Sequence, residues 1–319
     1  MRGLATIGLV VFSLLPFTST NLVADDLKGR VVVIAGEITV KKDGPELVDQ
    51  LSHDSLATVV TAETDKVQVR VEDPSHREIV GWVERSRVVT LAQRLEQLDQ
   101  DLSTNKTAWL LQLRGRIRQE QNDRDGALND LNDSLALDAK RATAWVDRAA
   151  LHRARGAHAP ASSDLEEALR LEPNHPVARL ERSRMAQADS ALDEAHEQIE
   201  IAIKHAPELP RLRLHRAQIH HLRKNTEEAL ADYSDVLRSD ARHVDALHGR
   251  GNIYHQMERF EEAIADFTAA IAHAPTDPRG YLSRGTTRLA YGYPIKAMMD
   301  YDQAVKLDPK DPHGWIGRG

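Results

Sequence analysis

Histidines are the side chains whose spacing in this sequence most readily suggests chemistry. His221 and His255 share one position of a 34-residue period, and with His248 they could meet at one metal ion if neighbouring helices face each other. No carboxylate close by completes such a ligand set, and surface histidine is the alternative that we favour. The sequence contains no G-x-S-x-G, H-E-x-x-H, Walker or zinc-ligand spacing. We therefore expect no catalytic site, no cofactor and no metal.

Arginine recurs with the same 34-residue period, at Arg114, Arg148, Arg182, Arg216, Arg250, Arg284 and Arg318. Sixteen residues after most of these come acids, at Asp130, Asp164, Asp232, Asp266 and Asp300, and Gln198 breaks this second column. A partly buried guanidinium is costly without a partner, so we interpret the columns as ion pairs that join helices. On this basis we expect Arg250→Leu to be tolerated better than Asp266→Ala. The alternative, an arginine ladder for an anionic ligand, is disfavoured by the accompanying acids.

This 34-residue period also organises the elements that must position these side chains. A small residue follows each arginine, and alanine recurs at this interval from Ala127 to Ala297. Within 263–271, apolar residues fall at i, i+1, i+4, i+7 and i+8, which is one face of a helix. A unit buries such a stripe only by stacking on its neighbours, and Pro275 ends the helix.

The fifth unit carries the pattern most completely, in LHGRGNIYHQMERFEEAIADFTAAIAHAP, with Leu247, Gly251, Tyr254, Ala263, Phe267 and Pro275. This pattern resembles the tetratricopeptide repeat family, whose unit is a helix, a turn and a second helix. The resemblance covers residues 109–319. It implies a mainly α fold, a right-handed α-solenoid with six repeats at 108–309 and the start of a truncated seventh at 310–319. We expect either a fragment of a longer array or a partner that covers the exposed end.

Residues 28–90 have a different pattern, in which short β-branched runs alternate with turn-forming segments. We expect five strands in a small barrel, and the stretch Gly81-Trp82-Val83 resembles the bacterial SH3-like family. That resemblance implies contact with peptides or cell-wall material, although Trp82 is also explained as core packing. In 91–105, leucines at intervals of four, three and four predict an amphipathic linker helix that caps the first repeat.

Residues 1–24 have the order of a secretory signal, with one arginine, an apolar run and a small residue at Ala24. We expect export to the periplasm or the extracellular space, without stable membrane insertion after cleavage; the alternative is an uncleaved anchor. A net charge of −7 opposes binding of nucleic acid, and the absence of cysteine excludes disulfides and thiolate sites.

The family resemblance also implies a concave groove lined by the first helix of each repeat. Carried onto this sequence, it gives as partner-binding residues Arg116, Arg153, Arg184, Arg211, Gln218, His248, Asn252 and Arg279. The groove positions hold five arginines against two acids, so we expect a neutral-to-acidic peptide or protein segment as the ligand. The alternative is that these side chains are merely solvated.

Taken together, these patterns predict a noncatalytic protein-interaction scaffold of the cell envelope. The alternative is an accessory or sensory part of an enzyme complex, or a fragment of an enzyme whose catalytic segment lies past Gly319. A continuing repeat array after Gly319 would favour the scaffold, whereas a new domain would favour the alternative.

Overall fold

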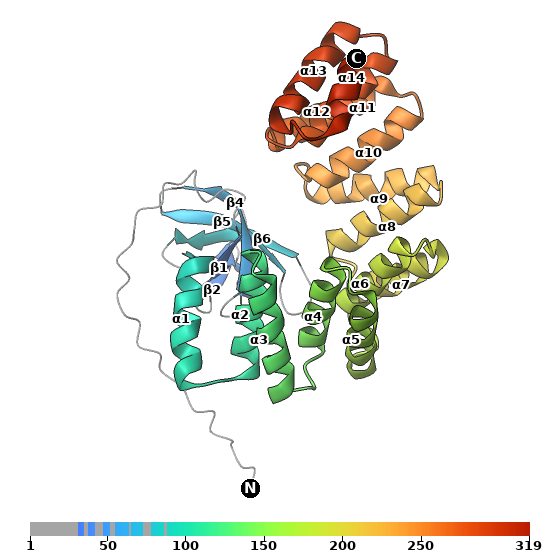
Figure 1. Ribbon diagram of the computed structural model, residues 1–319. Coiled ribbons are helices and arrows are strands. Elements are labelled where there is room, and N and C mark those ends of the chain that lie inside the picture. Colours follow the sequence, from blue (N-terminus) through green and yellow to red (C-terminus); the bar gives the residue numbers. More distant parts are fainter. Residues whose placement is uncertain are drawn as a thin grey trace.

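The computed structural model describes residues 31–34, 38–41, 47–51, 55–63, 65–72, 78–85 and 88–319. In this part of the chain fourteen helices follow seven short strands, so the fold is mainly α (Figure 1). The predicted signal segment 1–24 lies outside the described residues.

The helices after the first form antiparallel pairs in which each helix packs mainly on its partner. The first helices of the pairs are α2 (Ala108–Glu120), α4 (Ala142–Ala154), α6 (Pro176–Ala188), α8 (Pro210–Leu222), α10 (Val244–Gln256) and α12 (Pro278–Ala290). The second helices are α3 (Arg124–Leu137), α5 (His158–Leu171), α7 (Leu192–His205), α9 (Thr226–Ser239), α11 (Phe260–His273) and α13 (Pro294–Leu307). A last helix, α14 (Pro312–Arg318), stands where a further first helix begins. The starts of the first helices keep the 34-residue period throughout, as the sequence predicts.

The turn inside each pair has the same backbone conformation in all six repeats. One residue there has positive φ, and the six are Asn122, Gly156, Ser190, Lys224, Glu258 and Gly292. The left-handed conformation ends the first helix and lets the next amide groups bond back to it, as when Ala157 N–H donates to His152 O at 2.9 Å. Glycine occupies this position in two repeats, and asparagine, which tolerates this conformation, occupies it in the first, so the strained residues are Ser190, Lys224 and Glu258.

Small residues let the paired helices approach closely. Phe267 is fully buried, and a Cβ added at Gly251 would lie 2.8 Å from its ring. The burial of one such aromatic side chain contributes about 3 kcal/mol. The repeating core therefore requires a small residue on the first helix wherever a large one projects from the second.

The N-terminal strands form one sheet with the order β3-β2-β6-β5-β4-β1-β7. They are β1 (Val31–Ile34), β2 (Ile38–Lys41), β3 (Leu47–Leu51), β4 (Ser55–Ala62), β5 (Lys66–Glu72), β6 (Glu78–Glu84) and β7 (Val88–Thr90). The described part thus has seven strands instead of the five expected, and β3 and β7 are its edges. Among these residues no pairing joins the two edges, so the expected barrel is not seen. The sequence reasoning missed that β1 and β2 are separate strands with different neighbours.

Helix α1 (Leu91–Thr104) joins the sheet to the repeats. Thr90 caps its first turn through a reciprocal pair of hydrogen bonds with Gln93. Leu98 is fully buried in a cluster that contains Val33 of the sheet and Leu110 of α2. Because this apolar core is continuous, α1 fixes the sheet to the first repeat.

Candidate functional site

The arginine column forms the ion pairs that the sequence predicts. Two nitrogens of each arginine donate to both oxygens of one buried aspartate, with shortest distances of 2.6–2.8 Å. The pairs are Arg114–Asp130, Arg148–Asp164, Arg216–Asp232, Arg250–Asp266 and Arg284–Asp300. In the third repeat, where Gln198 replaces the acid, Arg182 lies 3.7 Å from Glu194. These arginines therefore join the paired helices and are not arranged for a ligand.

The first helices line the inner side of the array. Consecutive first helices contact one another from α2 to α12, whereas consecutive second helices approach each other less. An array bends toward the side on which its helices are closer, so the first helices lie on the concave face. The predicted partner-binding residues all belong to these first helices.

The structure brings two of the predicted arginines together on a carboxylate that sequence reasoning missed. Arg153 Nε of α4 donates to Glu181 Oε2 of α6 at 2.7 Å, and Arg184 donates to Glu181 Oε1 at 2.6 Å. Glu181 is only 3% exposed, while the Arg184 side chain is 38% exposed. One buried charge thus orients two guanidinium groups, and the cluster has one net positive charge.

A second polar group joins the first two repeats on the same face. The buried side chain of Gln112 donates to Asp147 at 2.7 Å and accepts from Arg141 at 2.8 Å. Desolvation raises the pKa of Asp147, and the nearby charge of Arg116 opposes this rise. Arg116 itself is exposed. No pattern in the sequence signals this group, because the residues that contact are 29 and 35 positions apart and their types do not recur in other repeats.

The remaining predicted residues differ in their access to solvent. Arg279 is exposed but paired, with Asp245 at 3.2 Å and Asp277 at 2.7 Å. Arg211 is half-buried, and Gln218 and Asn252 are exposed. His248 is buried against the Phe267 ring, and desolvation lowers its pKa. Its imidazole therefore belongs to the core more than to the groove.

The histidines do not assemble a metal site within the described residues, where no three metal-ligating side chains lie together. His255 instead contacts Thr287 Oγ1 through Nδ1 at 3.0 Å, and it packs against Phe260. His221 is half-buried on α8. His221 and His255 thus occupy the same repeat position but lie in different surroundings.

A serine and a histidine lie together in the core between repeats. His215 Nε2 is 3.0 Å from Ser183 Oγ, the geometry of a nucleophile and its base. Ser183 is fully buried, however, and its hydroxyl donates to Ala195 O at 2.6 Å. Burial lowers the pKa of His215 to about 4. The pair is inaccessible to a substrate and acts as a neutral hydrogen bond between α6 and α8.

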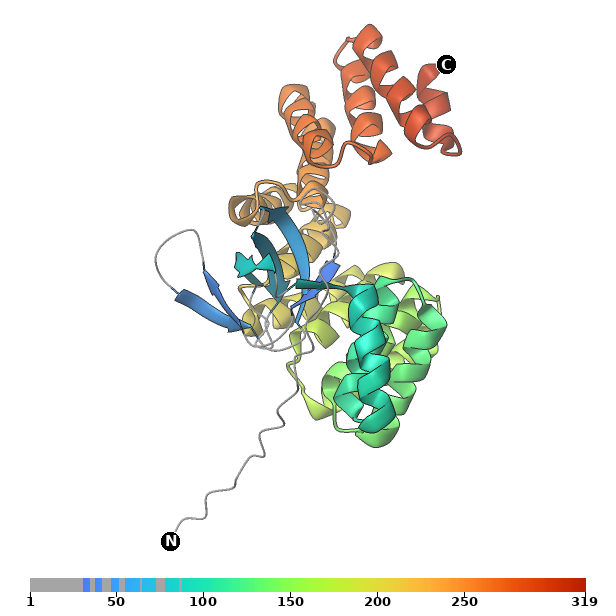
Figure 2. The same cartoon turned by 90° about the vertical axis from the view of Figure 1, so that its left-hand side faces the viewer.

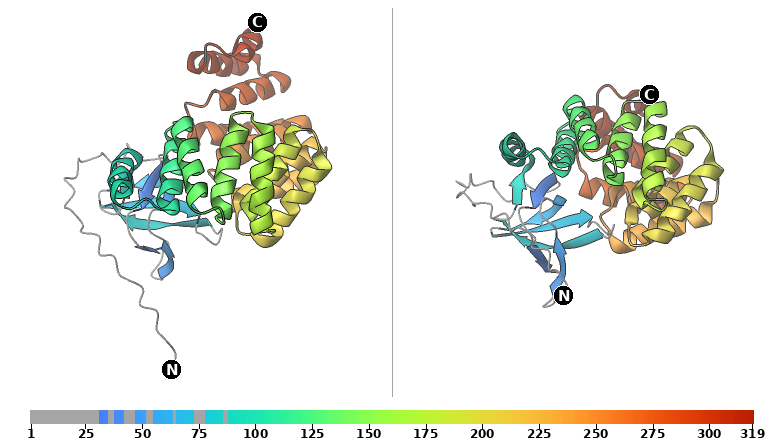
Figure 3. Two further views of the ribbon diagram at one scale, coloured as in Figure 1. Left: turned by 60° about the horizontal axis from the view of Figure 1, so that its bottom comes forward. Right: turned by 90° about the horizontal axis from the view of Figure 1, so that it is seen from below.

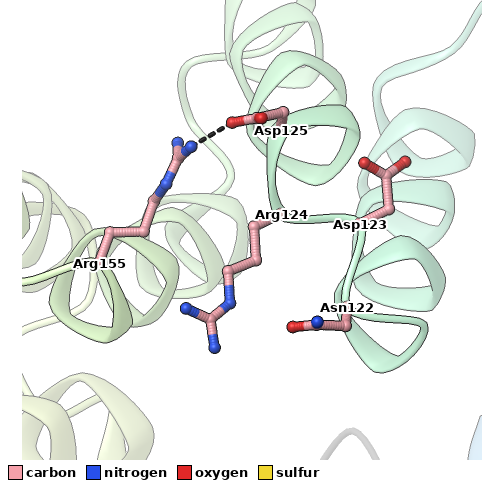
Figure 4. Close-up of a pocket in the computed structure, with 5 residues that line it drawn as sticks. All are labelled: Asn122, Asp123, Arg124, Asp125 and Arg155. Carbon is pink, nitrogen blue, oxygen red and sulfur yellow. Dashed lines mark hydrogen bonds and ion pairs between the residues drawn. The ribbon is translucent and has the colours of Figure 1, made fainter.

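An open depression of about 420 Å³ lies at the turn of the first repeat (Figure 4). It is lined by Asn122, Asp123, Arg124, Asp125 and Arg155, and an ion pair between Arg155 and Asp125 crosses it. Its residues come from the end of α4, the turn between α2 and α3 and the first turn of α3, and none of them is a predicted groove residue. No helix among the described residues is long and apolar enough to cross a membrane.

Comparison with known proteins gives both sequence and fold matches. Residues 180–241 and residues 244–277 each match a model described as tetratricopeptide repeat. No curated protein matches the sequence.

Among solved structures, a chain of the APC/C hetero-tetramer Cut9-Hcn1 is similar with a TM-score of 0.66 at 15% identity over 71% of this chain. The match spans 45% of that chain. The type IV pilus biogenesis factor PilW is similar with a TM-score of 0.61 at 14% identity, over 67% of this chain and 99% of PilW. A tetratricopeptide repeat protein from Parabacteroides merdae ATCC 43184 is similar with a TM-score of 0.56 at 21% identity, over 72% of this chain and 91% of that one. At these identities the likeness shows the fold. The matched models identify tetratricopeptide repeats at residues 180–241 and 244–277, and the described helix pairs have the fold of such repeats from α2 to α13.

Proposed function

We propose that this protein is a noncatalytic scaffold that binds a neutral-to-acidic peptide or protein segment on the concave face of its first helices. The observation that carries the proposal is the sharing of Glu181 by Arg153 and Arg184. A guanidinium has five donors, and Glu181 takes one from each arginine. The half-exposed Arg184 is thereby held in place with donors left for a ligand carboxylate.

The surroundings of this cluster favour an extended ligand. Arg116, on the first helix two repeats before that of Arg184, is exposed and lies near Asp147. Arg211 is half-buried on α8, the first helix that follows α6. Polar groups that recur along a groove suit a chain that crosses several repeats, with charge providing attraction and orientation. The fold neighbours that are described as a pilus biogenesis factor and as part of a hetero-tetramer support a role in assembly.

We also propose that the chain acts in the cell envelope, with 1–24 as its export signal and the array wound as a right-handed solenoid. The N-terminal sheet is proposed to be an SH3-like module that contacts peptide or cell-wall material. Fractionation of cells that express the full chain tests the first point. Recovery of the unprocessed chain in the cytoplasmic fraction would contradict it.

The groove is tested by fluorescence anisotropy with three labelled peptide pools, one acidic, one neutral and one basic. We expect the acidic pool to bind best and to weaken with added salt. Replacing Arg116, Arg184 and Arg211 by glutamine should remove that preference, while Arg153 stays to pair with Glu181.

A matched control removes the same amount of charge from the outside of the array. Arg170, Arg238 and Lys306 lie on exposed last turns of second helices, and their replacement by glutamine should leave binding unchanged. Equal losses in the two triple variants would refute the groove, because net charge alone would then explain the binding.

A further inference from the structure

Among the described residues, two contacts between the N-terminal sheet and the helices stand out, and they are far apart in the sequence. The first is the apolar cluster in which Val33 and Val89 of the sheet pack with Leu98 of α1 and Leu110 of α2. This contact is apolar and buried. It anchors one end of the sheet to the first repeat.

The second contact is ionic and lies at the fourth repeat. Arg70 of β5 donates through a terminal nitrogen to Asp240 Oδ2 at 2.8 Å, across 170 residues of sequence. Asp240 is the residue that caps the end of α9. The side chains are 31% and 17% exposed, so water and salt reach the pair.

These two contacts place the sheet on the concave side of the array. Figures 2 and 3 show the strands within the bend that the helices describe from α1 to α9. The first helices line that side, and Arg153, Glu181 and Arg184 lie on them between the two contacts. The sheet therefore lies on the same side of the array as the proposed groove.

We propose that the Arg70–Asp240 ion pair is an ionic latch, which holds the sheet across the concave face and opens to admit a ligand. The apolar contact at α1 serves as the fixed end, and the ion pair as the end that releases. A partly exposed pair shifts a closed-to-open ratio by up to about fivefold, which is weak enough to be reversible. A ligand rich in carboxylates competes directly with Asp240 for Arg70, so the latch responds to the same ligand chemistry as the groove.

The absence of cysteine in this chain allows a clean distance measurement. Spin labels at Asp65→Cys, beside β5, and Arg238→Cys, on the exposed last turn of α9, report the latch by electron–electron double resonance. We expect one short, narrow distance at low salt. Asp240→Asn should add a longer, broader population, and high salt should do the same to the unmodified latch.

Two controls distinguish loss of the latch from a general loss of structure. Arg70→Asp combined with Asp240→Arg should restore the short distance, because the pair is re-formed with reversed charges. A label pair at Arg170→Cys and Arg238→Cys lies within the array and should not change in any variant. An unchanged Asp65–Arg238 distance distribution in Asp240→Asn, or at high salt, would overturn the latch.

The consequence for binding rests on the proposed function, and a second measurement keeps the two claims distinct. We expect Asp240→Asn to bind the acidic peptide pool up to about fivefold more tightly, because less of the protein is closed. Opening without a gain in affinity would overturn the proposed control of ligand access, because the ion pair would then hold the sheet without limiting access to the groove. If Asp240→Asn binds the acidic peptide pool with unchanged affinity and the distance between the spin labels is also unchanged, the latch alone is contradicted.

Discussion

Acid should weaken the contact between the third and fourth repeats because of His215. Its ring is 4% exposed, it contacts Ser183, and burial with the nearby charge of Arg184 lowers its pKa from 6.5 to about 4, against a smaller opposing effect of Glu181. Since the folded-state pKa is below the unfolded one, the neutral ring contributes its full stability above pH 6.5. That contribution is lost as the pH falls toward 4.

The size of the effect follows from the shift. A fall from 6.5 to about 4 corresponds to about 3 kcal/mol, of which 2 to 3 kcal/mol is lost between roughly pH 7.5 and 4.5. His215→Gln keeps a hydrogen-bonding group beside Ser183 but cannot titrate. Its stability should therefore fall less with acidification than that of the wild type, by this amount.

Hydrogen exchange of the α8 amides measures this difference locally, because a repeat array need not unfold in one step. His205→Gln, on the exposed last turn of α7, is the matched control and should follow the wild type. If wild type and His215→Gln lose protection in parallel between the two pH values, the buried neutral histidine does not explain the acid sensitivity.

Three further outcomes are expected from the repeat geometry. Arg250→Leu should lower the free energy of unfolding by about 3 kcal/mol, which is more than the loss in Asp266→Ala, and thermal melts compare the two. The reason is that Arg250→Leu leaves the more deeply buried charge unpaired, since the Asp266 side chain is 9% exposed and that of Arg250 is 23% exposed. The opposite order would restore the sequence-based expectation. Glu258→Gly should stabilise and Gly292→Ala should destabilise, each by about 1 kcal/mol, since φ is 59° and 89° there; like signs would contradict the strain. Gly251→Ala should cost about 1 to 3 kcal/mol by crowding Phe267, and an unchanged melting temperature would contradict that close approach.

Much of the repeat array could be predicted because the same contacts recur in each repeat. The 34-residue period gives the helix starts, and two residue types sixteen positions apart give the Arg–Asp pairs, since each pair lies within one helical hairpin. Burial was harder to predict. The sequence suggested that the arginine was the group most in need of a partner, whereas the structure buries Asp266 more deeply than Arg250.

The groove contacts could not be predicted in the same way. The position of Glu181 in its repeat is occupied by Asp147 in the second repeat and by His215 in the fourth, so no column marks it. Its partner Arg153 lies in the neighbouring repeat, and that contact depends on how successive units are rotated. The turn position with positive φ could not be predicted either. Glycine would indicate such a conformation, but residues such as Lys224 occupy the position in several repeats.

Binding of ligands on the first helices of the array is tested most directly by hydrogen–deuterium exchange of the full chain, with and without the acidic peptide pool. We predict ligand-dependent protection on α4, α6 and α8, around Arg153, Glu181 and Arg184, with none on the outer faces of α5, α7 and α9. Protection confined to those second helices, or no protection on α6 at saturating peptide, would contradict binding in the groove.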